Sequence, residues 1–144
     1  MPSVVYNILK QKLMTGDVRL DGSGSQTFKV ALVTSSYTPD IDNHTSWANI
    51  TNEVSGAGYT SGGATLSGLT VFRDLTNDKG VFDANDVVWT NSTITARGAV
   101  IYRSDPSDPT QRWLVCYFDF TTDKSSSSGD FTIQWNANGI LNLT

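Results

Sequence analysis

The fold of this chain is decided by the stretch Trp113-Leu114-Val115-Cys116-Tyr117-Phe118-Asp119-Phe120. Aromatic and β-branched side chains are frequent in it, and such side chains pack well on the pleated surface of a β-strand. Successive side chains of a strand point to opposite faces, so Cys116 is expected to share a face with Leu114, Phe118 and Phe120. This face is predicted to be buried, which makes the stretch a strand of the core.

The segments on either side continue the β pattern. In the second half of the chain, strands are predicted at 86–89, 93–97, 99–103, 131–135 and 139–143, joined with the central stretch in an antiparallel meander. In the first half, strands are predicted at 17–20 and 27–34, as a hairpin around the turn at 21–25, and at 65–73 and 81–82. Short strands without a long helix between them indicate an all-β fold: an antiparallel β-sandwich, jelly-roll-like or Greek key.

The N-terminal segment carries a different, helical pattern. Val5, Ile8, Leu9 and Leu13 recur at helix spacing, and Gly16 follows where a left-handed glycine would end a helix. A short helix is therefore a candidate here. We interpret residues 1–20 as an N-terminal segment that holds this helix and the first strand and acts as a contact arm, and residues 21–144 as a single β-sandwich domain.

Size and charge exclude several classes of function. A chain of 144 residues is long enough for one domain whose core needs no metal ion. Its 10 basic and 14 acidic residues give a formal net charge of -4, and no cluster of Lys or Arg is present to follow a phosphate backbone. Direct binding to nucleic acid is therefore not expected. Neither a secretory leader nor a run of 18 apolar residues is found, so a place in a membrane is not expected either.

Residue types that carry catalysis or bind metal ions are few and scattered. His44, the only histidine, lies in the polar loop 35–45 and is expected to be a solvated surface side chain rather than a base. Asp83, Asn85 and Asp86 resemble the start of a calcium loop but lack the glycine and distal glutamate of an EF-hand. A turn is the favoured interpretation, and a bound Ca²⁺ is the alternative. We predict no catalytic, cofactor-binding or metal-binding residue, and no cofactor.

The glycine-rich run 56–63 is not expected to bind a nucleotide. Ser61 stands where the third glycine of a dinucleotide-binding loop would be, and no strand-turn-helix unit surrounds the run. A structural role is expected instead, in which glycines adopt positive backbone angles and Tyr59 anchors the turn. Cys116 is the only cysteine, which excludes an internal disulfide, and we expect it to be a buried structural thiol.

The aromatic residues leave one alternative open. The four tryptophans are Trp47, Trp89, Trp113 and Trp135. Core packing and subunit contacts account for them, but exposed rings on one face would also suit a platform for sugars. Such a platform needs two or more of these tryptophans, or Tyr37 and Tyr59, to be exposed together.

Several segments taken together resemble a widespread group of small tailed-phage proteins described as virion structural proteins. The resemblance is carried by 47–66 with its core Glu53-Val54-Ser55-Gly56-Ala57-Gly58-Tyr59-Thr60-Ser61-Gly62-Gly63, by Phe82-Asp83-Ala84-Asn85-Asp86-Val87-Val88-Trp89, by Ile94-Thr95-Ala96-Arg97-Gly98-Ala99-Val100-Ile101-Tyr102, and by Phe131-Thr132-Ile133-Gln134-Trp135-Asn136 with Gly139-Ile140-Leu141. These segments occur in order and cover most of the chain.

The resemblance implies a non-enzymatic structural protein of the virion. A β protein of this size, without fibre repeats or a long coiled coil, is similar to capsid decoration or cement proteins. Its expected location is the outer capsid surface, after synthesis in the cytoplasm of the bacterial host. Its expected partners are the major capsid protein and further copies of itself, as a dimer or trimer. The predicted contact surfaces are residues 1–20 and the loops 35–45 and 104–111, which are otherwise an ordinary terminus and ordinary loops.

Two other functions stay open at this point. The first is a tail or baseplate component, also structural, which differs from a decoration protein in its copy number. The second is a carbohydrate-binding module for host attachment, which depends on the exposed aromatic face described above. An enzyme ranks below both, because the sequence shows no set of catalytic residues.

Overall fold

The computed structural model describes residues 2–144, so Met1, the first residue of the predicted contact segment, lies outside the described range. The elements in this range are, in chain order, β1 (Val4–Val5), α1 (Asn7–Thr15), β2 (Phe28–Val33), β3 (Ala64–Thr65), β4 (Thr70–Asp74), β5 (Lys79–Asp83), β6 (Val87–Ser92), β7 (Thr95–Arg103), β8 (Leu114–Ser125), β9 (Gly129–Ile133) and β10 (Leu141–Leu143). Short 3-10 turns lie at Ser23–Ser25, Trp47–Asn49 and Pro109–Gln111. The N-terminal helix is thus present, and Gly16 ends it with a φ of 79°, which glycine adopts without strain.

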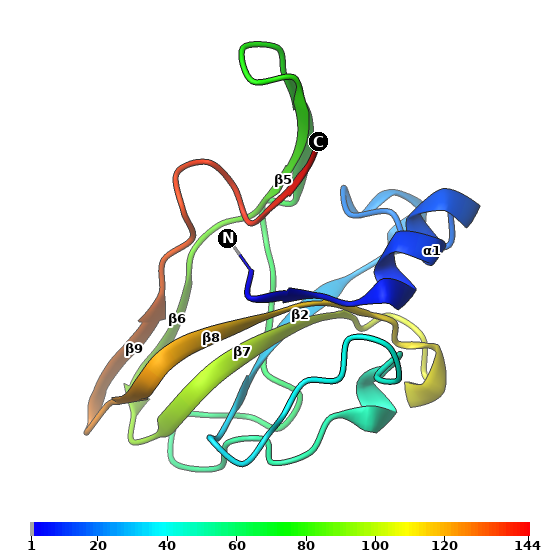
Figure 1. The fold of residues 1–144 in the computed structure, drawn as a ribbon. Coiled ribbons are helices and arrows are strands. Elements are labelled where there is room, and N and C mark those ends of the chain that lie inside the picture. Colours follow the sequence, from blue (N-terminus) through cyan, green and yellow to red (C-terminus); the bar gives the residue numbers. More distant parts are fainter. Residues whose placement is uncertain (1) are drawn as a thin grey trace.

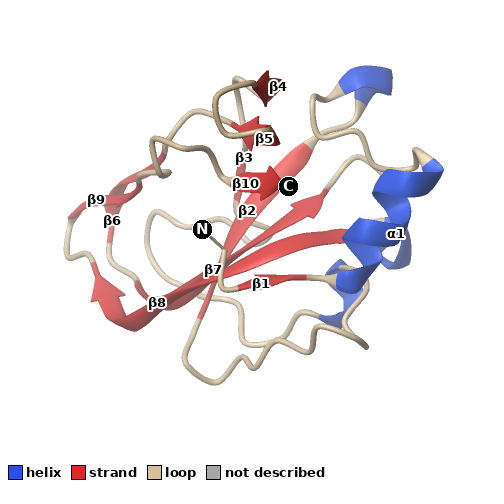
Figure 2. Ribbon diagram, turned by 45° about the horizontal axis from the view of Figure 1, so that its top comes forward, coloured by secondary structure: helices blue, strands red, loops and turns tan. Residues whose placement is uncertain are grey.

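The strands pair antiparallel in three sheets. Five of them form the sheet β1-β8-β7-β2-β3, three form β10-β5-β4, and two form β6-β9. Figure 1 shows β2, β7 and β8 crossing the molecule side by side, with β6 and β9 toward one end. Figure 2, with the top turned forward, shows α1 beside the opposite end of the same strands. The predicted all-β class with antiparallel strands is confirmed.

The main core lies between the five-stranded sheet and the two smaller sheets. Phe28, Ile101 and Cys116 come from the large sheet, whereas Phe82 and Ile133 come from the smaller ones, and all belong to one buried cluster. Burying a large apolar side chain of this kind contributes roughly 1.5–3 kcal/mol. Burial of this shared interior therefore holds the two layers together as a sandwich.

A second buried cluster covers the other face of the large sheet. Val100, Tyr102 and Leu114 point to this side from β7 and β8, and the segment that follows β2 lies over them with Tyr37 and Trp47. The Trp47 and Tyr102 rings stack with centroids 4.3 Å apart. Because the large sheet is buried on both faces, its central strands read as nearly continuous apolar runs.

Strand β8 departs from the predicted alternation at Val115. Ile101 pairs with Cys116, but the next residue, Tyr102, pairs with Leu114, so Val115 is an extra residue that forms a β-bulge. Cys116 faces the main core as predicted, while Leu114 belongs to the second cluster. The prediction that Leu114 shares the face of Cys116 is therefore wrong, because one inserted residue reverses the faces on either side of it.

The predicted hairpin of 17–20 with 27–34 is also wrong in its first half. Residues 28–33 form β2, but 17–20 form no strand. Instead, the side chain of Gln26 binds this segment: its oxygen accepts from the Arg19 amide at 2.7 Å, and its nitrogen donates to the Asp17 carbonyl at 3.0 Å. The side chain thus satisfies backbone groups that a partner strand would have bound.

The predicted meander is corrected by the pairing of β6. Strand β6 pairs with β9, whereas β7 and β8 pair with each other in the large sheet. The predicted strands 93–97 and 99–103 are one strand, β7, and the predicted strand 65–73 is divided into β3 and β4, which belong to different sheets. Neighbours in sequence are separated here because the chain alternates between the two layers of the sandwich.

The N-terminal segment is packed into the domain, so the division at residue 20 does not hold for the described residues. Strand β1 pairs with β8, and Tyr6 and Leu9 are fully buried. Val18 and Leu20 belong to the main core together with Leu9. Residues 2–20 therefore pack as part of the β domain, because their apolar side chains fill space that the sheets leave open, and their role as a contact surface stays a prediction.

Candidate functional site

His44 is not the solvated side chain that its polar loop predicts. Its ring is half-buried and stacks on Tyr37, with the ring centroids 5.7 Å apart. Nδ1 accepts a hydrogen bond from the Asp40 amide at 3.2 Å and lies 3.0 Å from the Tyr37 hydroxyl. The residue therefore holds the loop 35–45 against the second cluster. The prediction was wrong because the loop is otherwise polar, and nothing in its sequence indicates that Tyr37 is buried and offers His44 a ring to pack on.

The predicted turn at Asp83, Asn85 and Asp86 uses its side chains to bind nearby groups of the fold. Asp83 accepts from the Ala84 amide at 2.9 Å, and Asp86 accepts from the Trp135 amide at 2.9 Å. The Asn85 side chain donates to the Ser67 hydroxyl at 3.2 Å. Within residues 2–144, no group of three or more His, Cys, Asp or Glu side chains is placed to hold a metal ion.

The glycine-rich run wraps around a carboxylate that the sequence did not single out. Glu53 accepts from the Tyr59 hydroxyl at 2.7 Å and from the Gly62 amide at 2.7 Å. The same hydroxyl accepts from the Leu32 amide of β2 at 2.9 Å, and burial raises the pKa of Tyr59 far above its ordinary value. At Gly63, with a φ of 84°, a Cβ would collide with the backbone of β2. The run therefore has the structural role predicted for it, with Tyr59 as its anchor.

Cys116 and the aromatic rings also serve packing. Cys116 is completely buried, and this burial raises the pKa of its thiol. The four tryptophans and five tyrosines all lie within residues 2–144 and are all buried or half-buried. The exposed aromatic face that a sugar platform requires is therefore not formed in this structure.

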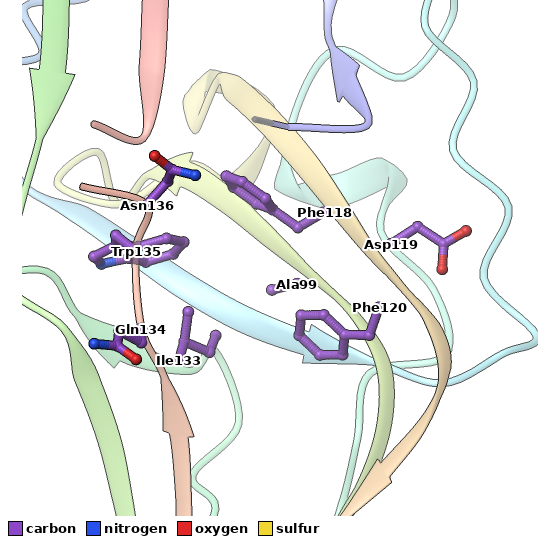
Figure 3. A pocket seen from close by; sticks show the side chains of 8 residues that line it. All are labelled: Ala99, Phe118, Asp119, Phe120, Ile133, Gln134, Trp135 and Asn136. Carbon is purple, nitrogen blue, oxygen red and sulfur yellow. The ribbon is translucent and has the colours of Figure 1, made fainter. Parts of the chain in front are cut away.

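A shallow cleft of about 310 Å³ opens between β8 and the segment that ends β9. Figure 3 shows Phe118 and Trp135 facing each other across it, with Phe120 and Ile133 nearby and the carboxylate of Asp119 turned away. The indole N–H of Trp135 already donates to the carbonyl of Asn85 at 2.9 Å. The cleft therefore offers mainly aromatic contact from Phe118, Phe120 and Trp135, with Gln134 and Asn136 as the polar side chains of its lining.

The most distinctive surface feature is the hairpin of β4 and β5, residues 70–83, which we call the projecting hairpin. Figure 1 shows it standing out beyond the body of the molecule, next to β10. Val71 is 52% exposed, Phe72 50%, and Leu75 in the turn 74%, while Leu143 of β10 beside the hairpin is 69% exposed. We call these four side chains the apolar patch: Val71 and Phe72 point to opposite faces of the projecting hairpin, Leu75 lies in its turn, and Leu143 lies on the neighbouring strand.

The base of the projecting hairpin is fixed in the core. Val81 and Phe82 of β5 are each only 2% exposed, and the Phe82 ring lies 6.5 Å from that of Phe28. The Phe82 carbonyl accepts from the Ile140 amide at 2.8 Å, in the segment that leads into β10. The exposed strand β4 is thus held on a rigid support.

The turn of the projecting hairpin is ordered by Asp74. Its carboxylate accepts from the amides of Thr76 and Asn77, each at 3.1 Å, and from the Asn77 side chain at 2.7 Å. The Asn77 side-chain hydrogen bond is the main reason that the pKa of Asp74 lies below its ordinary value. A turn that is already ordered loses little entropy when a partner binds, so the projecting hairpin is preorganised for contact.

The sequence did not identify the projecting hairpin as a site. The predicted strands 65–73 and 81–82, which contain parts of it, resemble ordinary strands of a sandwich, whose apolar side chains are expected to be buried. One signal was present: Val71 and Phe72 are adjacent and point to opposite faces, so both are buried only where the sheet is covered on both sides.

The loops 35–45 and 104–111, predicted as contact surfaces, lie side by side. The Trp47 amide donates to the Arg112 carbonyl at 2.9 Å, and the Leu114 amide donates to the Thr45 carbonyl at 3.0 Å. These bonds place the C-terminal ends of the two loops next to each other.

Among residues 2–144, no helix combines the length and apolar character that a bilayer crossing requires. Comparisons of the chain with family models, with curated proteins and with solved structures returned no match. The resemblance to small tailed-phage virion proteins therefore stays a prediction from the sequence.

Proposed function

We propose that this chain is a non-enzymatic structural protein of a tailed-phage virion, most specifically a decoration or cement protein on the outer capsid surface. The observation that carries the proposal is the projecting hairpin, a rigid support that presents the apolar patch to solvent. Several exposed apolar side chains on one projecting element favour its binding to another protein. The sequence resemblance supplies the setting in which such a protein would act.

The proposed partners are the major capsid protein and further copies of this chain. The loops 35–45 and 104–111, whose C-terminal ends lie next to each other, are the candidate contact with the capsid, and Ile41 in the first loop is an exposed apolar side chain. Several weak contacts made at once raise the effective concentration of each, so a small domain can bind a repeating lattice tightly. This mode of binding needs surfaces and no active site.

A tail or baseplate component is the second candidate, because the same surfaces would suit a ring of subunits. The two are separated by mass spectrometry and cryo-electron microscopy of purified particles from the phage that encodes the chain. Density for this β-sandwich at regular positions over the capsid lattice is the expected result. Density only at the tail would replace decoration with the second candidate, and absence of the chain from the particles would refute both.

The capsid contact is tested separately by sedimentation of the purified protein with capsids that lack it. Ile41→Asp places a charge in the loop surface and is expected to weaken binding by about tenfold or more, equivalent to a loss of at least ~1.4 kcal/mol. Val88→Asp is the matched control, because Val88 is an exposed apolar residue of β6, outside both loops. Equal binding by the two variants would refute the loop surface as the capsid contact.

A further inference from the structure

We propose that β4 pairs antiparallel with β4 of a second copy of this chain, forming a two-fold symmetric dimer with Phe72 at its centre. This inference rests on the proposed function, because it identifies how the structural subunit associates with itself. In the dimer, the sheets of the two copies join into one sheet of order β10-β5-β4-β4-β5-β10.

The outer edge of β4 is available for such pairing. In the sheet β10-β5-β4, no strand of the described residues pairs with β4 on the side away from β5. The strand is five residues long, about 17 Å. It contains no proline, and its register with β5 runs without a bulge from Thr70 to Asp74. Of the means by which proteins protect an edge strand, β4 lacks proline and bulges but carries two charged side chains, Arg73 and Asp74, which oppose most pairings and allow only those that place them favourably.

Symmetry limits the possible registers. Two antiparallel strands related by a two-fold axis keep the same face of each sheet on the same side, so residues placed opposite each other must point to the same face. In this sheet, Val71 shares a face with its partner Phe82, and Phe72 shares the other face with its partner Val81. An odd-numbered residue of β4 can therefore stand opposite only an odd-numbered residue of the second copy, and an even-numbered one opposite an even-numbered one.

One of these registers is self-complementary along the whole strand. With Phe72 opposite the second copy's Phe72, Val71 stands opposite Arg73 and Thr70 opposite Asp74. Leu75 then stands opposite Leu69, a half-buried residue that precedes β4. In this register the two Phe72 rings meet, Val71 meets the aliphatic stem of Arg73, the Thr70 hydroxyl meets the Asp74 carboxylate, and Leu75 of the turn lies near Leu69. Such cross-strand pairs stabilise antiparallel sheets.

The neighbouring registers are less favourable. A shift by one step in one direction places Arg73 opposite the second copy's Arg73 and Phe72 opposite Asp74, which opposes two like charges and a ring with a carboxylate. A further step in that direction places the two Asp74 carboxylates opposite each other. A shift in the other direction removes Leu75 from Leu69 and Phe72 from its own counterpart. Charge and apolar complementarity therefore select the register centred on Phe72.

The dimer is expected to be weak in free solution. A pair of edge strands buries less area than a stable interface of roughly 1,200 Å² or more. Because a capsid lattice holds neighbouring copies close together, the same pairing would be strengthened there by effective concentration. Dissociation constants in the micromolar to millimolar range are the expected result for the isolated protein.

The register is tested by disulfide crosslinking of variants that each carry one introduced cysteine, with oxidised glutathione as the oxidant. Phe72→Cys is expected to form dimers, because opposite residues of antiparallel strands lie about 4.5–5.5 Å apart between Cα atoms, within disulfide reach. Arg73→Cys alone is expected to crosslink about tenfold more slowly or less, because in this register its counterpart is a diagonal neighbour about 7–8 Å away. A mixture of Val71→Cys and Arg73→Cys proteins should crosslink to each other. The native Cys116 is buried and gives no background.

Val88→Cys is the matched control for random collision, because Val88 is 47% exposed and lies on β6, away from the proposed interface. Faster crosslinking of Phe72→Cys than of Arg73→Cys and Val88→Cys supports the register. Equal rates for all three, or faster crosslinking of Arg73→Cys, would overturn it.

Self-association is measured by analytical ultracentrifugation of the protein between about 1 µM and 1 mM. The wild-type chain is expected to show a monomer-dimer equilibrium, and Phe72→Asp is expected to weaken it at least about tenfold, whereas Val88→Asp leaves it unchanged. Circular dichroism checks that both variants are folded. A wild-type chain that stays monomeric over this range, or Phe72→Asp and Val88→Asp proteins that associate equally, would overturn the dimer.

The dimer and the virion role can fail independently. A dimer centred on Phe72 with no copy of the chain in purified particles would leave the inference standing and remove the proposed function. A chain that decorates the capsid but crosslinks no faster at Phe72 than at Val88 would do the reverse. If Phe72→Asp lost capsid binding while self-association stayed unchanged, the projecting hairpin would be a capsid contact and the dimer would be refuted.

Discussion

Replacement of Leu9 by alanine tests whether the N-terminal segment belongs to the domain. Leu9 is fully buried on α1 and packs in the main core. The substitution removes three carbon atoms, worth about 2.4 kcal/mol at ~0.8 kcal/mol each. The cavity that remains adds to this loss, so the expected decrease in the free energy of unfolding is about 3–5 kcal/mol. Domains of this kind are stable by only about 5–15 kcal/mol, so the loss is large.

The assay is urea unfolding followed by tryptophan fluorescence, with thermal unfolding as a second measurement. A loss of ~3 kcal/mol should lower the urea midpoint by roughly 1.5 M and the melting temperature by roughly 10 °C. Met14→Ala is the control on the same helix, because Met14 is 83% exposed and its truncation should change stability by no more than about 0.5 kcal/mol. If Leu9→Ala were no more harmful than Met14→Ala, α1 would not be packed in the core, and residues 1–20 would behave as the separable arm that the sequence suggested.

Two further predictions concern the backbone and pH. Gly63→Ala should lower the free energy of unfolding by about 2–5 kcal/mol, because it adds a collision with β2 to the strain of a positive φ. Gly16→Ala has open space at its Cβ and should lower it by only about 1–2 kcal/mol. Equal losses of the two variants in urea unfolding would contradict the close approach of Gly63 to β2. Burial acts to raise the pKa of Asp105, but the hydrogen bonds from Arg103 and from the Thr27 amide, together with the positive charge of Arg103, outweigh it, so the pKa lies below its ordinary value. Because the pKa of Asp105 is lower in the folded state, its ionised carboxylate stabilises the fold at pH values above the unfolded-state pKa of about 3.9. Asp105→Asn should therefore be less stable than the wild type at pH 7, and the difference should shrink as the pH falls below about 4. A difference that stays constant with pH would refute this role.

The residue pattern within a segment predicted its structure correctly where the interactions of that segment alone decide its conformation. The helix of the N-terminal segment followed from the spacing of its apolar residues and from Gly16, and α1 ends at that glycine. The strand at 113–120 followed from its aromatic and β-branched residues, and it forms the first part of β8. Tyr59 as the anchor of the glycine-rich run was also predicted, although the carboxylate of Glu53, which the run surrounds, was not.

The errors arose where distant segments compete for the same backbone groups. The amide of Gln26 took the hydrogen bonds that a strand at 17–20 would have made, and no local pattern indicates that a side chain seven or nine residues away will do so. The bulge at Val115 moved Leu114 to the other face of the sheet, because the pairing partner β7 determines where the extra residue is placed. His44 became a half-buried anchor only because Tyr37 packs against the second cluster.

The all-β class, the short N-terminal helix and the positions of most strands follow from the amino-acid sequence, because they depend on the residue types and periodicity within each segment. Only the tertiary structure decided which strands pair, that residues 2–20 complete the core, and that β4 stands at an open edge with Val71 and Phe72 in solvent. The physical reason is that an apolar side chain is buried or exposed according to what covers it. For the projecting hairpin, that depends on where the sandwich ends, which no local segment specifies.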